Sequence, residues 1–503
     1  MESAVSLKNG NDIRGIALRR PDGAPVNLTP AIARRLAGAF CIWLEEQDPT
    51  LGRNPTIAIG TDSRLSGPAL QDAVSEGVRE RGNNVLLTGL STTPEMFRIL
   101  KDKKFGADAS IMITASHLPY EWNGLKFMTK KGAIESSDLS RILQIEQEQT
   151  RKGVRDNPLN LRGSVRTPSP SYLDTYAGDL VRTVRDATGK EKPLSGLRIL
   201  VDAGHGSGGF FASRVLEPLG ADTTGSQFLN PDGKFPAHIP NPENKEAMAS
   251  LQSAVLRNRA DFGILFDTDV DRAGAVGPDG QAINRNRLIA LISAILLEEK
   301  PGTIVTDSVT STGLAEFIAS RGGVHHRFKR GYKNVILEAQ RLNQKGIYTP
   351  LAIETSGHAA LLENGFLDDG AYLMVRLLIA LAKQKEKGRA LLDLISDLKE
   401  PREAIEIRPP FTPGIDFRAY GEKILTDFSA YVDRTPGLSP TPSNYEGVRV
   451  DFDRDHGDGW ALLRLSLHEP VLPINIESDR EGGAEIIRTI VFNFLSAYSE
   501  LHL

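Results

Sequence analysis

Two short segments of the chain carry side chains that could do chemistry. Residues 114–126, TASHLPYEWNGLK, place the hydroxyl of Ser116 near the basic groups of His117 and Lys126. Residues 267–272, DTDVDR, place three carboxylates at alternate positions, followed by a guanidinium. A serine hydroxyl is a weak nucleophile unless a base or an electrostatic field assists it. Closely spaced carboxylates repel one another unless a cation neutralises them. Together the two segments indicate phosphoryl transfer on a serine beside a bound divalent cation.

The residues before Ser116 are predicted to form a buried strand. Residues 109–114 are a compact apolar run bounded by polar residues, which is typical of such strands. Ser116 would then lie just past the carboxyl end of the strand, where open α/β sheets place their chemistry. Asn123 and Gly124 predict a turn that could fold Lys126 back towards the serine. For Ser116 taken alone, an ordinary strand exit with a capping serine is the alternative interpretation.

The three carboxylates of the second segment belong to Asp267, Asp269 and Asp271. They follow another apolar run, residues 262–266, and are therefore predicted to lie at a strand end. Mg²⁺ suits carboxylate oxygens that leave positions open for phosphate or water. An EF-hand loop needs glycine at its sixth position and glutamate at its twelfth, where this chain has Arg272 and Pro278. That class of calcium site is excluded, and a solvated acidic turn remains as the alternative.

Both segments resemble motifs of the α-D-phosphohexomutase family, which includes phosphoglucomutases, phosphomannomutases and phosphoglucosamine mutases. The family's serine loop is TASHNPxxxNGxK and its metal loop is DGDGDR. The likeness continues in the family's order with DIRG, GxDxRxSG, VDAGNG, PDGxFPxHxPNPE and the sugar-recognition loop GEMSGH, at residues 12–15, 60–67, 201–206, 231–243 and 353–358. The sequences TASHLPY (residues 114–120) and ETSGH (residues 354–358) resemble those of a plant or algal branch of the family. The resemblance covers nearly the whole chain.

The bulk composition narrows the classes of partner. The 60 basic and 64 acidic residues nearly cancel to a net charge of −4, which disfavours a nucleic-acid or membrane-surface partner. Cys41 is the only cysteine, which excludes an internal disulfide and favours a reducing compartment. The longest apolar stretch, residues 288–297, is far shorter than the roughly 20 residues of a membrane-spanning helix. A charged-then-apolar signal segment is not seen at the start, although an organelle leader could be missing there. The likeness to the plant or algal branch suggests a chloroplast stroma, with the cytoplasm as the alternative.

Alternating strand and helix patterns favour mixed or parallel sheets covered by helices. The strands are predicted at residues 56–60, 85–88, 109–114, 197–201, 303–306, 448–452, 460–465 and 474–477, and helices at 70–80, 371–383 (amphipathic) and 483–497. With 503 residues, the chain exceeds one ordinary core. The resemblance implies an α/β fold of three similar mixed-sheet domains plus a smaller C-terminal α+β domain around a central cleft. The expected domains are residues 1–165 with the serine loop, 166–285 with the metal loop, 286–403 with the sugar loop and 404–503 with a phosphate loop.

The resemblance also implies an enzyme, an intramolecular phosphotransferase that interconverts hexose 1-phosphate and hexose 6-phosphate. Ser116 would rest as phosphoserine, pass its phosphoryl group to the sugar and recover it from a bisphosphorylated intermediate. Mg²⁺ would be held by Ser116 and the three aspartates, and a hexose 1,6-bisphosphate would act as activator. Lys126 matches the family's proton-transfer residue, while Arg272 and His117 would steady the phosphoryl oxygens. For His117, a structural hydrogen-bonding role is the alternative.

Substrate-binding residues are carried over from the same resemblance. Glu354 and Ser356 would bind sugar hydroxyls, and His358 would orient that loop or act near the transferred proton. Lys333 occupies the place of a basic residue in the third-domain loop, with a solvated surface lysine as its alternative. Arg14 would assist the active-site phosphate or pair with a carboxylate between domains.

The chain departs from the family pattern in two loops. The C-terminal loop RPSGTEPxxR keeps Arg464 and Ser466 but has Leu467, His468 and Pro473 in place of glycine, threonine and arginine. These changes restrict the backbone and remove a bidentate phosphate clamp. The metal loop has Thr268 and Val270 where glycines are usual, and β-branched residues tolerate a positive φ poorly.

The departures leave three functions open. The first is a phosphohexomutase, with glucose as the favoured sugar and a phosphosugar as its partner. The second is a phosphotransferase or phosphatase that loads Ser116 without completing the cycle. The third is a catalytically impaired homologue that binds sugar phosphates or regulates another process. Retention of the serine, lysine and aspartates favours the first. The sequence leaves the oligomeric state open.

Overall fold

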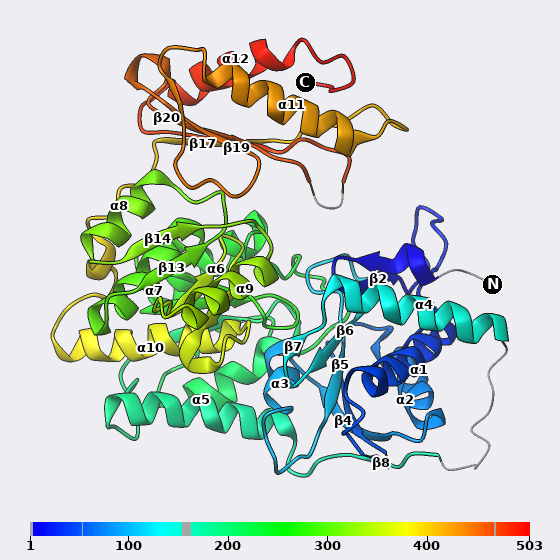
Figure 1. Ribbon diagram of the computed structural model, residues 1–503. Coiled ribbons are helices and arrows are strands. Elements are labelled where there is room, and N and C mark those ends of the chain that lie inside the picture. Colours follow the sequence, from blue (N-terminus) through cyan, green and yellow to red (C-terminus); the bar gives the residue numbers. More distant parts are fainter. Residues whose placement is uncertain (1–3, 53, 153–161, 467–468) are drawn as a thin grey trace. The chain divides into compact units, whose positions relative to one another are not determined.

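The computed structural model describes residues 4–52, 54–152, 162–466 and 469–503 (Figure 1). The chain forms two compact units. The first comprises Met1–Asn284, Ser356–Ala359 and Leu367–Leu391, and the second comprises Arg285–Thr355, Ala360–Phe366 and Leu392–Leu503. The predicted four-domain boundaries are finer than this division and stay a prediction.

The first sheet carries the serine loop. Among the described residues it has eight strands, in the order β1-β2-β6-β5-β3-β4-β8 with β7 paired to β6. Parallel pairing joins β3 to β4 and β5, whereas β6 runs antiparallel to β5 and β2, so the sheet is mixed as predicted. The strands are β1 Lys8–Asn9, β2 Asp12–Ile16, β3 Thr56–Thr61, β4 Asn84–Leu90, β5 Ala109–Ile113, β6 Trp122–Thr129, β7 Gly132–Ala133 and β8 Val165–Arg166.

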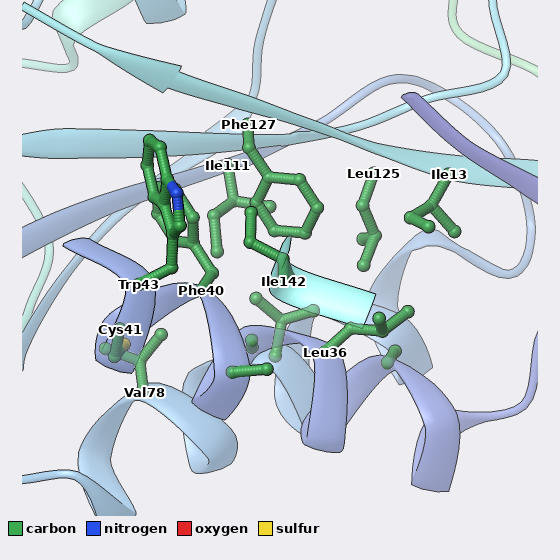
Figure 2. Packing of buried hydrophobic residues seen from close by; sticks show 14 of the residues in the cluster. Ile13, Leu36, Phe40, Cys41, Trp43, Val78, Ile111, Leu125, Phe127 and Ile142 are labelled. Atoms are coloured by element: carbon green, nitrogen blue, oxygen red, sulfur yellow. The ribbon is translucent and has the colours of Figure 1, made fainter. Parts of the chain in front are cut away.

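Helices cover both faces of this sheet because alternate strand residues point to opposite sides. Ile111 and Phe127 face a core shared with α1 and α4, and Figure 2 shows Phe40 and Trp43 of α1 and Ile142 of α4 packed there. Met112 faces the other core, against α3 and α5. The helices are α1 Pro30–Gln47, α2 Gly67–Glu80, α3 Thr93–Arg98, α4 Ser136–Lys152 and α5 Tyr172–Thr188.

The turn predicted at Asn123 and Gly124 is wrong, because both residues lie inside strand β6. A Cβ at Gly124 would lie 2.3 Å from the carbonyl oxygen of Ile13 and 2.6 Å from that of Thr114. The glycine therefore permits a close approach of backbones. Lys126 reaches the serine loop by strand pairing, opposite Met112 of β5.

The second sheet carries the metal loop. Within the described part of the chain its order is β12-β11-β10-β9, with β9 parallel to β10 and the other pairs antiparallel. The aspartate segment connects β10 to β11 and so follows a buried strand, as predicted. The elements are β9 Ile199–Asp202, α6 Lys245–Asn258, β10 Phe262–Phe266, β11 Ala273–Val276 and β12 Ala282–Ile283.

Helix α10 (Gly370–Glu386), also in the first unit, corrects a second prediction. The pattern of residues 371–383 indicated an amphipathic helix, but residues from Gly370 to Ala382 are all buried. A helix that is apolar on every side is typical of a position inside a large protein.

The second unit contains a third sheet in the order β14-β13-β15-β16. Strand β13 is parallel to β14 and β15. The elements are α7 Arg285–Glu299, β13 Thr303–Thr306, α8 Thr312–Ser320, β14 Val324–Arg327, α9 Tyr332–Gln344, β15 Leu351–Ile353 and β16 Ala359–Leu361. The predicted strand at residues 303–306 is confirmed without change.

The C-terminal part of the second unit is an antiparallel sheet with two helices, which confirms the predicted α+β domain. Its order is β17-β21-β20-β19-β18. Phe428 of α11 and Ile487 of α12 share a core with Val450 and Ile474 of the sheet. The elements are β17 Glu403–Ile407, α11 Phe417–Val432, β18 Leu438–Pro440, β19 Val448–Phe452, β20 Gly459–Leu463, β21 Ile474–Ser478 and α12 Gly483–Leu495.

Short helical turns complete the elements. The 3₁₀ helices are Ala4–Leu7, Ser207–Gly209, Leu362–Asn364, Leu391–Ile395 and Arg454–His456, and a π-helical turn spans Ala212–Leu216. Across the part of the chain that the structure describes, no helix has both the length and the hydropathy to cross a membrane.

Candidate active site

Ser116 lies three residues beyond strand β5 in a conformation that serine rarely adopts. Its φ is +50°, in the left-handed region. Such a conformation costs about 1–3 kcal/mol and persists where the surroundings hold it, which is common at active sites. The Ser116 side chain is buried, and its backbone N–H donates to Thr114 Oγ1 at 2.9 Å.

The hydroxyl of Ser116 faces the metal loop. Ser116 Oγ donates to Asp267 Oδ2 at 2.9 Å and lies 3.4 Å from His117 Nδ1. Burial, followed by the charges of Asp271 and Asp269, raises the pKa of Asp267 well above its ordinary value. The structure therefore joins the two segments singled out from the sequence.

Lys126 binds one oxygen of each of the other two aspartates. Its Nζ lies 2.8 Å from Asp269 Oδ2 and 2.6 Å from Asp271 Oδ2. The second oxygens, Asp269 Oδ1 and Asp271 Oδ1, are buried and have no hydrogen-bond partner among the described residues. Asp267, Asp269 and Asp271 each offer an oxygen within 4.8 Å of the other two. This buried acidic triad with spare oxygens fits a divalent cation such as Mg²⁺.

Asp271 stays ionised in this cluster. Burial by itself would raise its pKa, but Lys126, His358 and Arg272 hold the pKa of Asp271 well below its usual range. The carboxylate is thereby kept in the form that a hard cation requires.

The backbone strain predicted for the metal loop occurs at Val270. Its φ is +65°, although it is β-branched and completely buried. Thr268, the other residue that replaces a family glycine, is not among the described residues with a positive φ. The chain thus keeps the glycine-like backbone at residue 270 with an unfavourable side chain.

His117 is held by Arg272. Arg272 Nη2 lies 3.0 Å from His117 Nδ1, and since a guanidinium can only donate, Nδ1 accepts. The charge of Arg272, followed by burial, lowers the pKa of His117 to about 2. The imidazole is therefore neutral at any working pH, which favours the hydrogen-bonding alternative for this residue.

Arg14 supports the backbone of the serine loop. Its Nη1 donates to the carbonyl oxygen of Ala115 at 3.0 Å, and its Nη2 lies 3.2 Å from Asp12 Oδ2. This carboxylate partner lies on the same strand, β2, and both roles expected for Arg14 stay predictions.

His358 forms a buried pair with a residue that the sequence analysis missed. His358 Nδ1 lies 2.5 Å from Asp368 Oδ2 and 4.0 Å from Asp271 Oδ1. Burial is the largest single effect and opposes protonation, but the charges of Asp368 and Asp271 and the hydrogen bond with Asp368 together raise the pKa of His358. These effects favour the protonated imidazolium beside the metal loop. Ser356 is buried in the same unit.

The second unit carries the predicted sugar-binding carboxylate. Glu354 is buried, and its Oε1 accepts the backbone N–H of Gly331 at 2.6 Å. Burial, followed by the charge of Glu354, raises the pKa of nearby Asp307 to about 7. Lys333 lies in the first turn of α9 and is half-buried.

The C-terminal loop, also in the second unit, keeps a buried arginine. Burial, followed by the charge of Arg330, lowers the pKa of Arg464. Arg464 Nε has no hydrogen-bond partner among the residues that the structure describes. Ser466 Oγ accepts the backbone N–H of Glu469 at 3.2 Å. Leu467 and His468 lie outside the described residues, so the effect of these two departures stays a prediction.

The predicted site residues thus form two groups, each described within its own unit. The first unit assembles Arg14, Ser116, His117, Lys126, Asp267, Asp269, Asp271, Arg272, Ser356 and His358, and the second contains Lys333, Glu354, Arg464 and Ser466. The roles assigned to these residues stay predictions.

Sequence reasoning missed two further residues with direct contacts in these groups. Thr93 Oγ1 donates to Asp269 Oδ2 at 2.5 Å, from a helix start that the capping pattern of residues 92–95 could have revealed. Arg330 lies two residues before α9, and its Nε is 4.0 Å from Oδ2 of Asp307. Its basic neighbours, residues 327–333, were the available signal.

Comparison with known proteins agrees with this geometry. Three domain models of phosphoglucomutase/phosphomannomutase match the chain: alpha/beta/alpha domain I at residues 6–152, domain II at 171–280 and domain III at 284–399. They confirm the three predicted α/β domains, and the C-terminal antiparallel sheet of the structure is the fourth.

Individual relatives point the same way. A phosphomannomutase/phosphoglucomutase of Pseudomonas aeruginosa is 30% identical over 452 residues, 88% of each chain. A crystal structure of a phosphoglucomutase/phosphomannomutase family protein from Burkholderia thailandensis covers 100% of both chains with 26% identity and a TM-score of 0.80. An N-acetylphosphoglucosamine mutase of Aspergillus fumigatus, in complex with GlcNAc-6P and magnesium, shares the fold at 13% identity, a TM-score of 0.51 and coverage of 90% of this chain and 79% of that one.

Proposed function

The chain belongs to the phosphoglucomutase/phosphomannomutase family of intramolecular phosphotransferases, and on that premise we propose that it interconverts glucose 1-phosphate and glucose 6-phosphate through a phosphoserine at Ser116. Interconversion of hexose phosphates is the activity of the family; the choice of glucose and the serine route are the proposal. One observation carries it: Ser116 Oγ lies 2.9 Å from Asp267 Oδ2 at the edge of a buried acidic triad.

The transfer step follows from the residues in the first unit. The bond between phosphorus and Ser116 Oγ breaks as the sugar hydroxyl oxygen bonds to phosphorus, and the hydroxyl proton must leave the sugar while Ser116 regains one. We assign the movement of this proton to Lys126, which is fixed in the same cluster by two carboxylates. Arg272, held beside His117, would meet the phosphoryl oxygens as a cation.

Asp269 and Asp271 would hold Mg²⁺ through Oδ1, which in each has no hydrogen-bond partner among the described residues, and Asp267 would complete the triad beside Ser116 Oγ. When bound, the cation would neutralise charge on the transferring phosphoryl group. The three carboxylates are buried together, and the neighbouring cations keep Asp271 ionised for metal binding.

Substrate recognition is assigned to both units. Glu354 would accept hydrogen bonds from sugar hydroxyls, with Ser356 and His358 in the same loop. Lys333, Arg464 and Ser466 would bind the phosphate that is not transferred. Burial of Arg464 supports the phosphate assignment, because its Nε has no hydrogen-bond partner among the described residues and buried charges are normally paired.

A catalytically impaired homologue is not favoured. Such a protein would have no need to keep the serine, the lysine and the metal carboxylates in mutual contact, as they are here. A phosphosugar is the proposed partner, a hexose 1,6-bisphosphate the proposed activator, and the chloroplast stroma the proposed location.

A coupled mutase assay tests the proposal. Glucose 1-phosphate is supplied with Mg²⁺ and a trace of glucose 1,6-bisphosphate, and mannose 1-phosphate and glucosamine 1-phosphate are assayed in parallel. Turnover of glucose 1-phosphate, lost in Ser116→Ala, is expected. Preference for another sugar would contradict only the choice of glucose. Turnover that persists in Ser116→Ala would contradict the assignment of Ser116 as the nucleophile. Phosphoserine by intact mass without turnover would indicate a half-reaction enzyme.

A further inference from the structure

Arg64 is completely buried and every one of its donors is used. Its Nε donates to Asp62 Oδ2 at 3.1 Å. Its two terminal nitrogens donate four hydrogen bonds to backbone carbonyls of the serine loop, those of Ser116, Leu118, Pro119 and Trp122. A guanidinium has five N–H groups, so all five are satisfied within the protein. Arg64 therefore has no donor left for a substrate.

The same ion pair reaches both peptide groups of Ser116. The carbonyl oxygen of Ser116 accepts directly from Arg64 Nη2. Its N–H donates to Thr114 Oγ1 at 2.9 Å, and Thr114 Oγ1 donates to Asp62 Oδ2 at 2.7 Å. Asp62, Arg64, Thr114 and Ser116 thus form a closed ring of hydrogen bonds around the strained residue.

A segment of the second sheet's region covers this ring. The Arg64 guanidinium carbon lies 5.1 Å from the centre of the Phe235 ring, and Arg64 forms a backbone bridge with Gly233. A Cβ at Gly233 would lie 2.5 Å from the carbonyl oxygen of Ser63, so the glycine is needed for this approach. Aromatic cover strengthens a buried cation by desolvated cation–π attraction.

Two properties of this arrangement decide the role of Arg64. Removing one partner of a buried ion pair is costly, so Arg64 and Asp62 depend on each other. The other four donors of Arg64 all bind carbonyls of the serine loop, so the pair fixes that loop. The left-handed φ of Ser116 would relax without a force on its peptide groups, and relaxation would swing Oγ away from Asp267 Oδ2.

We propose that Arg64 is a positioning residue for phosphoryl transfer: paired with Asp62, it holds Ser116 in the left-handed conformation that aims Oγ at the metal loop. The proposal rests on the proposed function of Ser116. It assigns a role to a residue that the sequence motif at 60–67 contains but does not explain.

Arg64→Lys tests the proposal, because lysine keeps the charge but cannot serve four carbonyls and a carboxylate. Arg98→Lys is the matched control: Arg98 also pairs with an aspartate, Asp179, and lies 5.8 Å from the ring centre of Tyr176, and both of these partners lie outside the serine loop. Both are compared at a temperature where circular dichroism shows them folded. Turnover is expressed per mole of enzyme able to form phosphoserine.

The expected result is a loss of roughly 100-fold in kcat for Arg64→Lys with KM within about threefold, since a misplacement near 1 Å has this effect. Arg98→Lys should stay within about twofold of the wild type. Amide hydrogen exchange at residues 116–122 should be faster in Arg64→Lys alone. A folded Arg64→Lys with wild-type kcat and wild-type exchange would overturn the proposal, whereas a fall shared equally by both variants would reduce Arg64 to a purely structural residue.

Thr114→Val provides a second arm if Arg64→Lys does not fold. It removes the link from Asp62 to the N–H of Ser116 with little change in shape, and it should also speed exchange at residue 116 and lower kcat. Unchanged exchange and kcat in this variant would overturn the ring as the holding device. A wild-type enzyme without phosphoserine or turnover would sink the proposed function instead, and the exchange measurement would still decide whether Arg64 holds the loop.

Discussion

Lys126 Nζ lies 2.6 Å from Asp271 Oδ2, while Asp271 Oδ1 has no hydrogen-bond partner among the described residues. Asp269 likewise binds Lys126 through Oδ2, and its Oδ1 has no hydrogen-bond partner among the described residues. Each carboxylate therefore serves the lysine with one oxygen and leaves the other for a cation. Lysine and metal are expected to share these carboxylates rather than compete for them.

The first prediction concerns metal binding without reference to turnover. Mg²⁺ should raise the Tm of the wild-type protein, and chelation with EDTA should reverse the rise, because binding only to the folded state stabilises it by about 2.7 kcal/mol at a hundredfold excess over Kd. Asp269→Asn should lose most of this response in differential scanning fluorimetry. Glu243→Gln, near Arg272 but outside the triad, serves as control. An equal Mg²⁺ response in Asp269→Asn would contradict the site.

The second prediction concerns Lys126. Lys126→Met leaves Asp269 and Asp271 buried without their cation, which should lower the free energy of unfolding by about 3–5 kcal/mol in the absence of Mg²⁺. Saturating Mg²⁺ should recover part of the loss, because the metal supplies the missing charge. Urea denaturation with and without Mg²⁺ measures both numbers. A loss that Mg²⁺ leaves untouched would mean that lysine and metal do not share the carboxylates.

The third prediction uses the backbone of Val270. At a position with an ordinary negative φ, glycine lowers the free energy of unfolding by about 0.5–1 kcal/mol relative to alanine. At the φ of +65° seen for Val270, alanine remains strained and glycine does not. Val270→Gly should therefore be more stable than Val270→Ala by about 1 kcal/mol, although it removes more of the side chain.

Val201 provides the control for this inversion. It is equally buried, in strand β9 of the same sheet, and is not among the described residues with a positive φ. Val201→Ala should be more stable than Val201→Gly by chemical denaturation. If residue 270 showed the same order as residue 201, the left-handed backbone at Val270 would be wrong.

The fourth prediction concerns pH. Burial raises the pKa of Glu95 from 4.5 to about 8, against a smaller opposing effect of its hydrogen bond with Thr92. Because the folded state prefers the protonated acid, its contribution to stability is fully present below pH 4.5, is lost as pH rises towards 8 and is constant above that.

Glu95→Gln removes this titration and keeps a hydrogen-bond acceptor for Thr92. Relative to the wild type, the variant should gain a few kcal/mol in free energy of unfolding between pH 5 and pH 9. Urea unfolding of both proteins at these two values gives the difference. Parallel pH profiles would show that Glu95 titrates normally.

The sequence predicted those parts of the fold that depend on local pattern. Strands 303–306 and 448–452 were placed to the residue, because β-branched and apolar runs end there at polar residues. The Asn123–Gly124 turn failed because the same dipeptide also permits close packing of strands, which only tertiary contacts reveal. The amphipathic helix predicted at residues 371–383 failed for a related reason: even Arg376 is buried, because elements distant in sequence such as α5 pack against α10.

The candidate site also contains residues that the sequence predicted and residues that it did not. Ser116, Lys126 and the aspartates were predicted because reactive groups stand close together in short segments. Arg64 and Thr93 were missed because each contacts a partner far along the chain, and Asp368 was missed although its partner His358 is only ten residues away. A motif indicates that such a residue is present, but not whose carbonyl or carboxylate it binds.

Gly124 limits how far the sequence around the serine can drift. Any side chain there would strike the backbone on both sides, at Ile13 and at Thr114, and would force apart the strand that carries Arg14 and the loop that carries Ser116. A protein that tolerated such a change by widening its sheet would keep its shape while losing the alignment of its nucleophile. A substitution at residue 124 is therefore expected to lower activity even in a variant that still folds.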